Sequence, residues 1–112
     1  MKRRFRLTRS TDFKRVRRFG KSYAHPLVVL VVLQNETDRV RVGIAASRSV
    51  GGAVERNRAK RRLRAALQPA LEALVPGWDL VLIARKPILG ATFSEIGDAL
   101  QVLRARAGLF ED

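Results

Sequence analysis

The segment from Ala53 to Leu67 has the pattern of a helix with two opposed faces. At roughly 100° per residue, the small and apolar side chains between here and Leu74 fall on about a third of the circumference. They are Ala59, Leu63, Ala66, Leu67, Ala70 and Leu74. The opposite side carries Asn57, Lys60, Arg61, Arg64 and Gln68. We therefore predict a helix that packs its apolar face on a sheet and leaves a basic face outside.

Three apolar segments supply the strands of that sheet. Residues 27–34 are leucine-rich and β-branched, as in a strand buried on both faces. A turn cluster at 35–38 follows, and residues 39–46 form a second strand that begins with a period of two. We predict that these two strands make an antiparallel hairpin. Residues 79–85 are the third strand.

Capping residues delimit the other helices. Residues 1–9 read as an extended basic arm, and Ser10 is placed to cap a helix over 11–19. Gly20 stands where a left-handed C-terminal cap belongs. Pro69 interrupts the central helix and starts a short helical stretch to about Val75.

The last helix has the clearest boundaries. Thr92 and Glu95 have the spacing of a capping box, which predicts a helix through about Ala107 that Gly108 ends. The order of elements is therefore α-β-β-α-β-α, with a short extra strand possible near Tyr23. This order predicts one domain over residues 1–112, of the α+β class, a two-layer α/β sandwich with a small mixed sheet.

Net charge indicates the kind of partner. The chain has 23 lysines and arginines against 10 acids, a formal charge of +13. This favours nucleic acid, because neutralising phosphates releases condensed counterions; a basic membrane-surface protein is the alternative. The longest aliphatic run, residues 27–33, is far shorter than the roughly 20 residues that cross a bilayer. With no cysteine, we expect a soluble cytoplasmic protein that does not bind a membrane.

Positive charge is also segregated along the chain. Ten basic residues lie between Lys2 and Lys21, and six more between Arg56 and Arg64. Basic residues that merely keep a surface soluble would be mixed with acids. Clustering of this kind indicates a footprint for phosphates, which arginine can bind with two parallel hydrogen bonds. Asn57, an amide among cations, could contact a sugar hydroxyl or base edge, or cap the local backbone; the sequence leaves both open.

Few residues could carry out chemistry. His25 is the only imidazole, and its place before Pro26 favours a packing or surface role. The acids form no local cluster with metal-ligand spacing. We therefore predict no catalytic residue and no metal site on this chain.

A longer motif surrounds the basic helix. A glycine-containing loop precedes Arg56-Asn57-Arg58 and a further basic run, so that the motif spans residues 47–64. Three flanking pieces agree with it in order: Leu7 through Asp12-Phe13 to Gly20, Arg41-Val42-Gly43, and Ile83-Ala84-Arg85-Lys86-Pro87. Over nearly its whole length, the sequence resembles the protein subunit of bacterial ribonuclease P.

The resemblance implies a subunit of a ribonucleoprotein endonuclease that removes the 5′ leader from precursor tRNA. The catalytic centre would lie in the RNA subunit, which would also hold most of the Mg²⁺, and the isolated protein would be inactive. Its partners would be the ribonuclease P catalytic RNA and precursor tRNA, with no small-molecule substrate and the protein itself monomeric.

The same resemblance assigns residues to each partner. The RNA-binding residues would be Arg48, Arg56, Asn57, Arg58, Lys60, Arg61, Arg62 and Arg64. A cleft between the first helix and the sheet would hold the single-stranded leader, lined by Phe13, Val16, Arg17 and Val31. Because Arg17 and Val31 stand where relatives commonly have an aromatic residue, base stacking would depend more on Phe13.

The resemblance also implies a left-handed crossover from strand 39–46 through the basic helix to strand 79–85, although handedness rules alone favour a right-handed one. Two other functions compete with this interpretation. One is a structural RNA-binding protein of the ribosomal or RNA-chaperone type. The other is a DNA-binding module that uses residues 54–67 as a recognition helix, although that helix has little base-reading chemistry beyond Asn57.

Overall fold

The computed structural model describes residues 5–108. Its helices are α1 (Ser10–Phe19), α2 (Ala53–Leu67) and α3 (Phe93–Ala107), and its strands are β1 (Lys21–Ala24), β2 (Val28–Gln34), β3 (Arg41–Ala46) and β4 (Trp78–Ala84). Short 3₁₀ helices span Arg48–Val50, Gln68–Ala73 and Lys86–Gly90. The α+β class and the order of elements are as predicted, and β1 is the short extra strand near Tyr23. The stretch that Pro69 opens is 3₁₀ and ends at Ala73.

The strands form one mixed sheet in the order β1-β2-β4-β3. β2 pairs antiparallel with both β1 and β4, and β3 pairs parallel with β4. The predicted hairpin between residues 27–34 and 39–46 is therefore wrong, because β4 lies between those two strands. The two central strands of the sheet, β2 and β4, are those that are apolar on both faces. β3 has Arg41, Gly43 and Ala45 on one face, which suits an edge.

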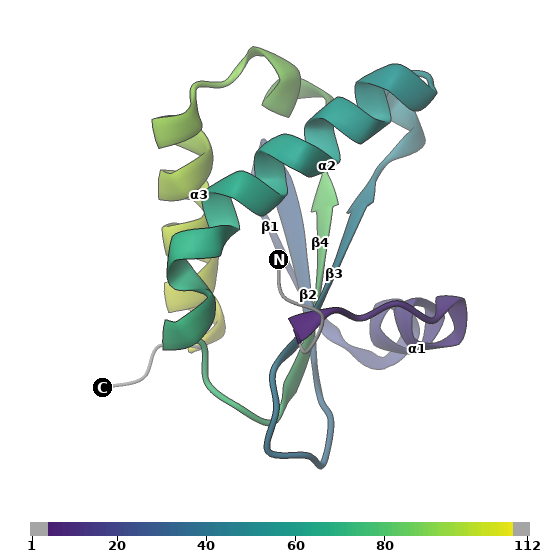
Figure 1. Cartoon of the computed structure of the whole chain (residues 1–112), viewed down its shortest axis with the longest axis vertical. Coiled ribbons are helices and arrows are strands. Elements are labelled where there is room, and N and C mark those ends of the chain that lie inside the picture. The colour runs from purple at the N-terminus through teal and green to yellow at the C-terminus, as the bar shows by residue number, and fades with distance from the viewer. Residues whose placement is uncertain (1–4, 109–112) are drawn as a thin grey trace.

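α2 connects the parallel strands β3 and β4 by a left-handed crossover. Figure 1 shows this directly: α2 passes in front of the sheet, both strand arrows point upward, and β4 lies to the left of β3. A right-handed connection would place β4 on the right. The handedness implied by the resemblance is therefore present.

Helices cover the two faces of the sheet unequally. α2 and α3 pack on one face and enclose the larger core, which includes Leu30, Leu63, Leu82, Ile96 and Leu103. α1 packs on the other face and encloses a small second core of Leu7, Val16, Val31 and Val81. The sheet thus gains a partial third layer beyond the two that were predicted.

The ends of α1 differ from the prediction. The helix begins at Ser10 itself and Arg9 precedes it, so Ser10 is not the cap. Gly20 has an extended backbone with φ −78°, not a left-handed one. A glycine is needed there for space: a Cβ would lie 2.5 Å from the carbonyl oxygen of Val16 and 2.7 Å from that of Val32. The chain therefore turns directly from α1 into β1.

The caps of α3 are as predicted. The Thr92 hydroxyl accepts a hydrogen bond from the Glu95 amide at 3.1 Å, and the Glu95 carboxylate accepts one from the Thr92 amide at 2.8 Å. These bonds hold the pKa of Glu95 below its usual range. Gly108 is left-handed, with φ 72°.

The described part of the N-terminal arm, residues 5–9, lies against the sheet. Arg6 forms a parallel bridge with Val42, and the Leu7 amide donates a 2.9 Å hydrogen bond to the Val42 carbonyl. The Leu7 side chain is buried in the small core. The arm therefore covers part of the outer edge of β3; the remainder of the predicted arm, residues 1–4, lies outside the described residues.

Candidate RNA interface

The basic side of α2 faces away from the core. Ala59, Leu63, Ala66 and Leu67 are buried against the sheet and α3, as the period of the segment predicted. Asn57, Arg58 and Arg61 are exposed, while Arg56, Lys60 and Arg64 are half-buried at the boundary of the core. Arg48 is exposed in the 3₁₀ turn just before the helix. We call these seven residues the α2 ridge: Arg48, Arg56, Asn57, Arg58, Lys60, Arg61 and Arg64.

The cations of the α2 ridge are not neutralised by the protein. Between residues 5 and 108, the ion pairs join Arg15 or Arg41 to Asp12 or Asp79, and none involves α2. The Asn57 side chain makes no hydrogen bond to another described group, so it does not act as a local cap. The ridge therefore presents charge and an amide that are available to a ligand.

Arg62 differs from its neighbours on α2. Its Nη2 donates a hydrogen bond to the carbonyl oxygen of Ala91, in the loop before α3, and its side chain is half-buried. This bond ties α2 to the loop that leads into α3. Of the predicted RNA-binding residues, Arg62 thus has a structural contact that the others lack within residues 5–108.

A groove runs between the α2 ridge and strand β3. It has a volume of about 370 Å³ and is lined by Arg56, Asn57 and Lys60 from α2. On the other side it is lined by residues Ile44, Ala45 and Ala46 of β3. Because β3 is an edge strand with small side chains here, a ligand can approach both the helix and the strand.

The opposite face of the sheet holds the second predicted site. The Phe13 ring packs on Gly43: a Cβ at Gly43 would lie 2.4 Å from the ring Cζ. Phe13 is half-buried and Arg17 is exposed, so both can meet a ligand. Val16 and Val31 cannot, because they are 0% and 3% exposed where α1 packs on the sheet. These two valines, which we had expected to line a leader cleft, therefore belong to the small second core and not to its surface.

The sheet offers other residues at this face that the sequence had not indicated. Val29 pairs with Ile83, and Ile83 pairs with Ala45, so these residues form one row across β2, β4 and β3. All three are half-exposed, since α1 covers only part of this face. Alternation along each strand could have placed them together, but only once the order β2-β4-β3 was known. We call Phe13, Arg17 and this row the sheet-face site.

The two surfaces meet at β3. A second cavity of about 220 Å³ is lined by Arg6, Leu7 and Thr8 of the arm, Phe13 of α1, Val42 and Ile44 of β3, and Arg64 of α2. Phe13 and Arg64 therefore border the same cavity although they lie on helices that pack on opposite faces of the sheet. The α2 ridge and the sheet-face site form one continuous region.

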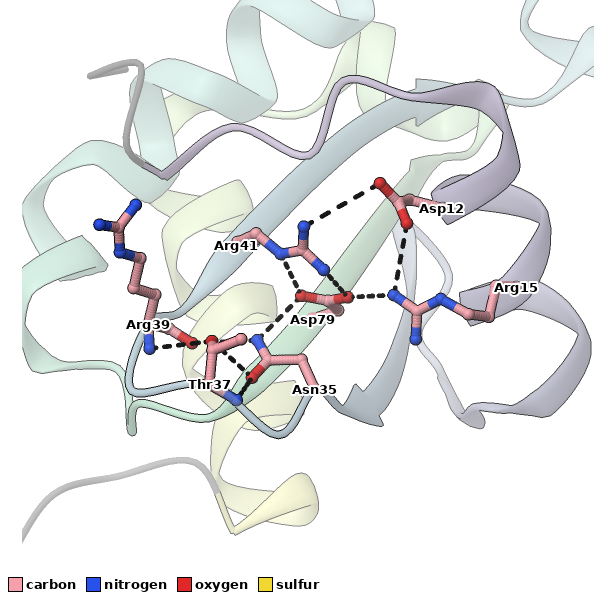
Figure 2. Close-up of polar contacts among 7 residues, drawn as sticks. All are labelled: Asp12, Arg15, Asn35, Thr37, Arg39, Arg41 and Asp79. Atoms are coloured by element: carbon pink, nitrogen blue, oxygen red, sulfur yellow. Dashed lines mark hydrogen bonds and ion pairs between the residues drawn. The ribbon is translucent and has the colours of Figure 1, made fainter.

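A buried carboxylate fixes α1 to the sheet (Figure 2). Asp79, at the start of β4, is 0% exposed and accepts hydrogen bonds from Arg41 Nε at 2.9 Å and Nη2 at 2.8 Å. Asn35 Nδ2 donates to it at 2.9 Å, and Arg15 of α1 donates as well. Asp12 lies 3.6 Å from Arg15 and extends the network.

Opposing effects set the protonation of this network. Burial by itself would raise the pKa of Asp79, but the hydrogen bonds from Arg41, Asn35 and Arg15 outweigh it and hold that pKa below its usual range. The hydrogen bond to Asp79 likewise raises the pKa of Arg41. Asp79 is therefore ionised at neutral pH, and it holds α1 in the orientation that places Phe13 on Gly43.

Features of other kinds of site are few. Nδ1 of His25 accepts a hydrogen bond from the Leu27 amide at 3.1 Å, which gives this side chain a local structural contact. Among residues 5–108, no three histidine, aspartate or glutamate side chains are placed to hold a metal ion. The helices of this same part of the chain are too short or too polar to span a bilayer.

Similar proteins were found by sequence and by structure. The family model described as Ribonuclease P matches residues 1–108. The ribonuclease P protein component of Herpetosiphon aurantiacus is 41% identical over 112 residues, which cover 100% of this chain and 91% of that one. The same component of Clostridioides difficile is 38% identical over 104 residues, covering 92% and 91%.

Two solved structures have the same fold. The ribonuclease P protein of Staphylococcus aureus superimposes with a TM-score of 0.82 at 30% identity, covering 96% of this chain and 98% of that one. The protein from Thermotoga maritima gives a TM-score of 0.77 at 28% identity, covering 89% and 96%. The family match, these relatives and the shared fold agree over nearly the whole chain: it belongs to the bacterial ribonuclease P protein family, whose members are subunits of an endoribonuclease.

Proposed function

We propose that this chain, acting as one RNA-binding unit, joins the catalytic RNA of ribonuclease P to the 5′ leader of precursor tRNA. The α2 ridge binds the catalytic RNA, and the sheet-face site binds the single-stranded leader. The observation that carries the proposal is the junction at β3, where Phe13 and Arg64 border one cavity. Two RNA segments held there are brought within a few side-chain lengths of each other.

The α2 ridge suits a folded RNA. Its arginines and lysine are spaced at i, i+3 and i+4, so they reach successive phosphates, and none is already paired with a carboxylate of residues 5–108. Asn57 adds a group that can both donate and accept, which is suited to a ribose hydroxyl at the groove beside β3.

The sheet-face site suits an unpaired strand. Phe13 offers an aromatic ring, and the row Val29, Ile83 and Ala45 offers a flat apolar surface beside it. Base stacking on an aromatic contributes roughly 1–3 kcal/mol per base and tolerates any sequence. Arg17, at the margin of the site, adds attraction for a phosphate.

In this proposal the RNA subunit, not the protein, catalyses phosphodiester hydrolysis. Phosphodiester hydrolysis with Mg²⁺ needs several oxygen ligands around the ions, and the described part of this chain brings no such group together. In this proposal RNA phosphates hold the Mg²⁺, and the protein reduces the repulsion between two polyanions. The isolated protein is inactive.

The test is reconstitution. The purified chain is mixed with the catalytic RNA of a bacterial ribonuclease P and a precursor tRNA at low Mg²⁺, and cleavage at the mature 5′ end is measured. We expect the protein to stimulate cleavage and tighten substrate binding, with Phe13→Ala losing the leader-dependent part of that gain. A protein that does neither would contradict the proposal. A ribosomal or chaperone-type protein would bind both RNAs without stimulating cleavage.

A further inference from the structure

The outward side of α1 carries cations that the Asp79 network does not use. Arg15 points inward to Asp79, whereas Lys14, Arg17 and Arg18 are exposed. Within residues 5–108, no carboxylate lies within 4.0 Å of a nitrogen of these three side chains. Because they are spaced at i, i+3 and i+4, they are neighbours on the helix surface. α1 thus divides its cations into one that is neutralised and three that are not.

An exposed aromatic ring lies beside one of these cations, Arg18. Phe19, the last residue of α1, is 66% exposed and belongs to neither core. The Arg18 guanidinium lies 5.2 Å from the centre of its ring. An aromatic ring open to solvent next to a cation is the combination that binds an unpaired base together with its phosphate. Because Phe19 packs in neither core, folding does not explain why an aromatic residue stands at this position.

This surface continues the sheet-face site. Phe13 and Arg17 are four residues apart and so lie on the same side of α1, and Lys14 and Arg18 flank Arg17 on the side away from the sheet. Figure 1 shows α1 standing apart from α2 and α3, with its outer side clear of both. A strand that leaves the sheet-face site past Arg17 therefore meets Lys14 and Arg18 first. To reach Phe19, which lies beside Arg18 but on a further side of the helix, it must bend around the C-terminal end of α1.

We propose that Lys14, Arg18 and Phe19 form a distal leader site, which binds the unpaired nucleotides upstream of those on the sheet face. Lys14 and Arg18 hold phosphates, and Phe19 stacks on a base. This inference rests on the proposed function, because it extends the same bound strand. The outer side of α1 has no apolar stripe besides Phe19, which argues against a membrane as its partner.

The experiment uses the reconstituted holoenzyme and a set of precursor tRNAs whose leaders grow by single nucleotides. Binding is measured for the wild type, for Phe19→Ala and for the double variant Lys14→Ala/Arg18→Ala. With short leaders we expect all three to bind equally. With leaders long enough to cross α1, the wild type should gain affinity and each variant should lose about tenfold of that gain.

Salt gives a second readout. Because two phosphate contacts to a single strand are removed, the slope of log K against log salt should be shallower by about 1.4 in the double variant. This difference should be seen only with long leaders. The control Arg39→Ala removes charge from an exposed residue outside α1 whose side chain makes no hydrogen bond or ion pair within residues 5–108, and it should keep the leader-length dependence of the wild type.

The outcomes separate this inference from the proposed function. If the wild type gains nothing from any leader, the proposed function fails. The wild type could instead gain affinity from the leader through Phe13, while the α1 variants show the same dependence of affinity on leader length as the wild type. In that case the distal leader site is wrong. Equal losses at every leader length would mean that α1 contacts the catalytic RNA, which also overturns the inference. Thermal unfolding of both variants should match the wild type, since all three side chains are exposed.

Discussion

α1 and α2 are both strongly basic helices, but the protein treats their charge differently. On α1, Arg15 is held by a buried carboxylate from β4, and that pairing attaches the helix to the sheet. On α2, attachment comes from Ala59, Leu63 and Leu67, and the arginines other than Arg62 are left without a described protein acceptor. The comparison teaches that an arginine's role depends on what the fold places opposite it, which for Arg15 is a residue 64 positions away in sequence.

The largest effect expected from this difference is at Asp79. Asp79→Asn leaves Arg15 and Arg41 facing a neutral group in a buried setting, so we expect the free energy of unfolding to fall by about 3 kcal/mol. The two guanidinium groups are about a third exposed, which keeps the loss at the lower end of the range for a broken buried pair. Thermal or urea unfolding measures it. Asp98→Asn, at an exposed carboxylate of α3, should change stability by less than about 0.5 kcal/mol.

The same carboxylate predicts a pH dependence. Because the pKa of Asp79 is lower in the folded than in the unfolded chain, its stabilisation is present above the unfolded pKa, about 3.9, and is lost as pH falls through the folded value. The difference in unfolding free energy between wild type and Asp79→Asn should therefore shrink in that acid range. A difference that stays constant from pH 7 to strong acid would show that the carboxylate charge is not what holds α1.

Next in size is the contact between α1 and β3. Gly43→Ala places a Cβ 2.4 Å from the Phe13 ring, which must then move, at a cost of about 2 kcal/mol. Gly97→Ala in α3 is the matched control, because its Cβ would meet nothing within 4 Å. Alanine is the better helix former, so this control should stabilise the protein by roughly 0.5–1 kcal/mol. If both substitutions change stability alike, Phe13 does not rest on Gly43 in solution.

The smallest effects separate two neighbours on α2. Arg62→Ala removes the hydrogen bond to Ala91 and should lower the free energy of unfolding by about 1 kcal/mol. Arg61→Ala should change it by less than about 0.5 kcal/mol, yet weaken binding of the catalytic RNA by about tenfold. Unfolding and RNA titration of the two variants test this. The reverse pattern would show that Arg61, not Arg62, supports the fold.

Local patterns predicted the helices well. The spacing of Ala59, Leu63 and Leu67 among basic residues predicted which face of α2 is buried. The Thr92–Glu95 spacing predicted the first turn of α3. The strand pairing was not predicted, because a hairpin between neighbours is the simplest choice and β4 enters between them from much later in the chain. The same limit applies to Val16 and Val31, whose burial depends on how α1 lies across the sheet.

The Asp79 network shows a different limit. Its members Asp12, Arg15, Asn35, Arg41 and Asp79 come from four separate segments. Only Asp12 and Arg15, three residues apart on α1, are related by their spacing along the chain. The one local signal is an acid at the start of an otherwise apolar strand, which indicates a partner but not its identity. The α2 ridge was easier to find because all its residues lie within one helix and the loop before it.

The position of β3 sets how close the two proposed RNA segments can come. Gly43 faces the sheet-face site, Ile44 and Ala46 face the groove beside α2, and Ala45 borders both. Only one extended backbone therefore separates them, and its thickness is fixed by covalent geometry and not by any loop. In the proposed complex this strand acts as a spacer of constant width, so the distance from leader to catalytic RNA is the same in every bound molecule, whatever the leader's sequence.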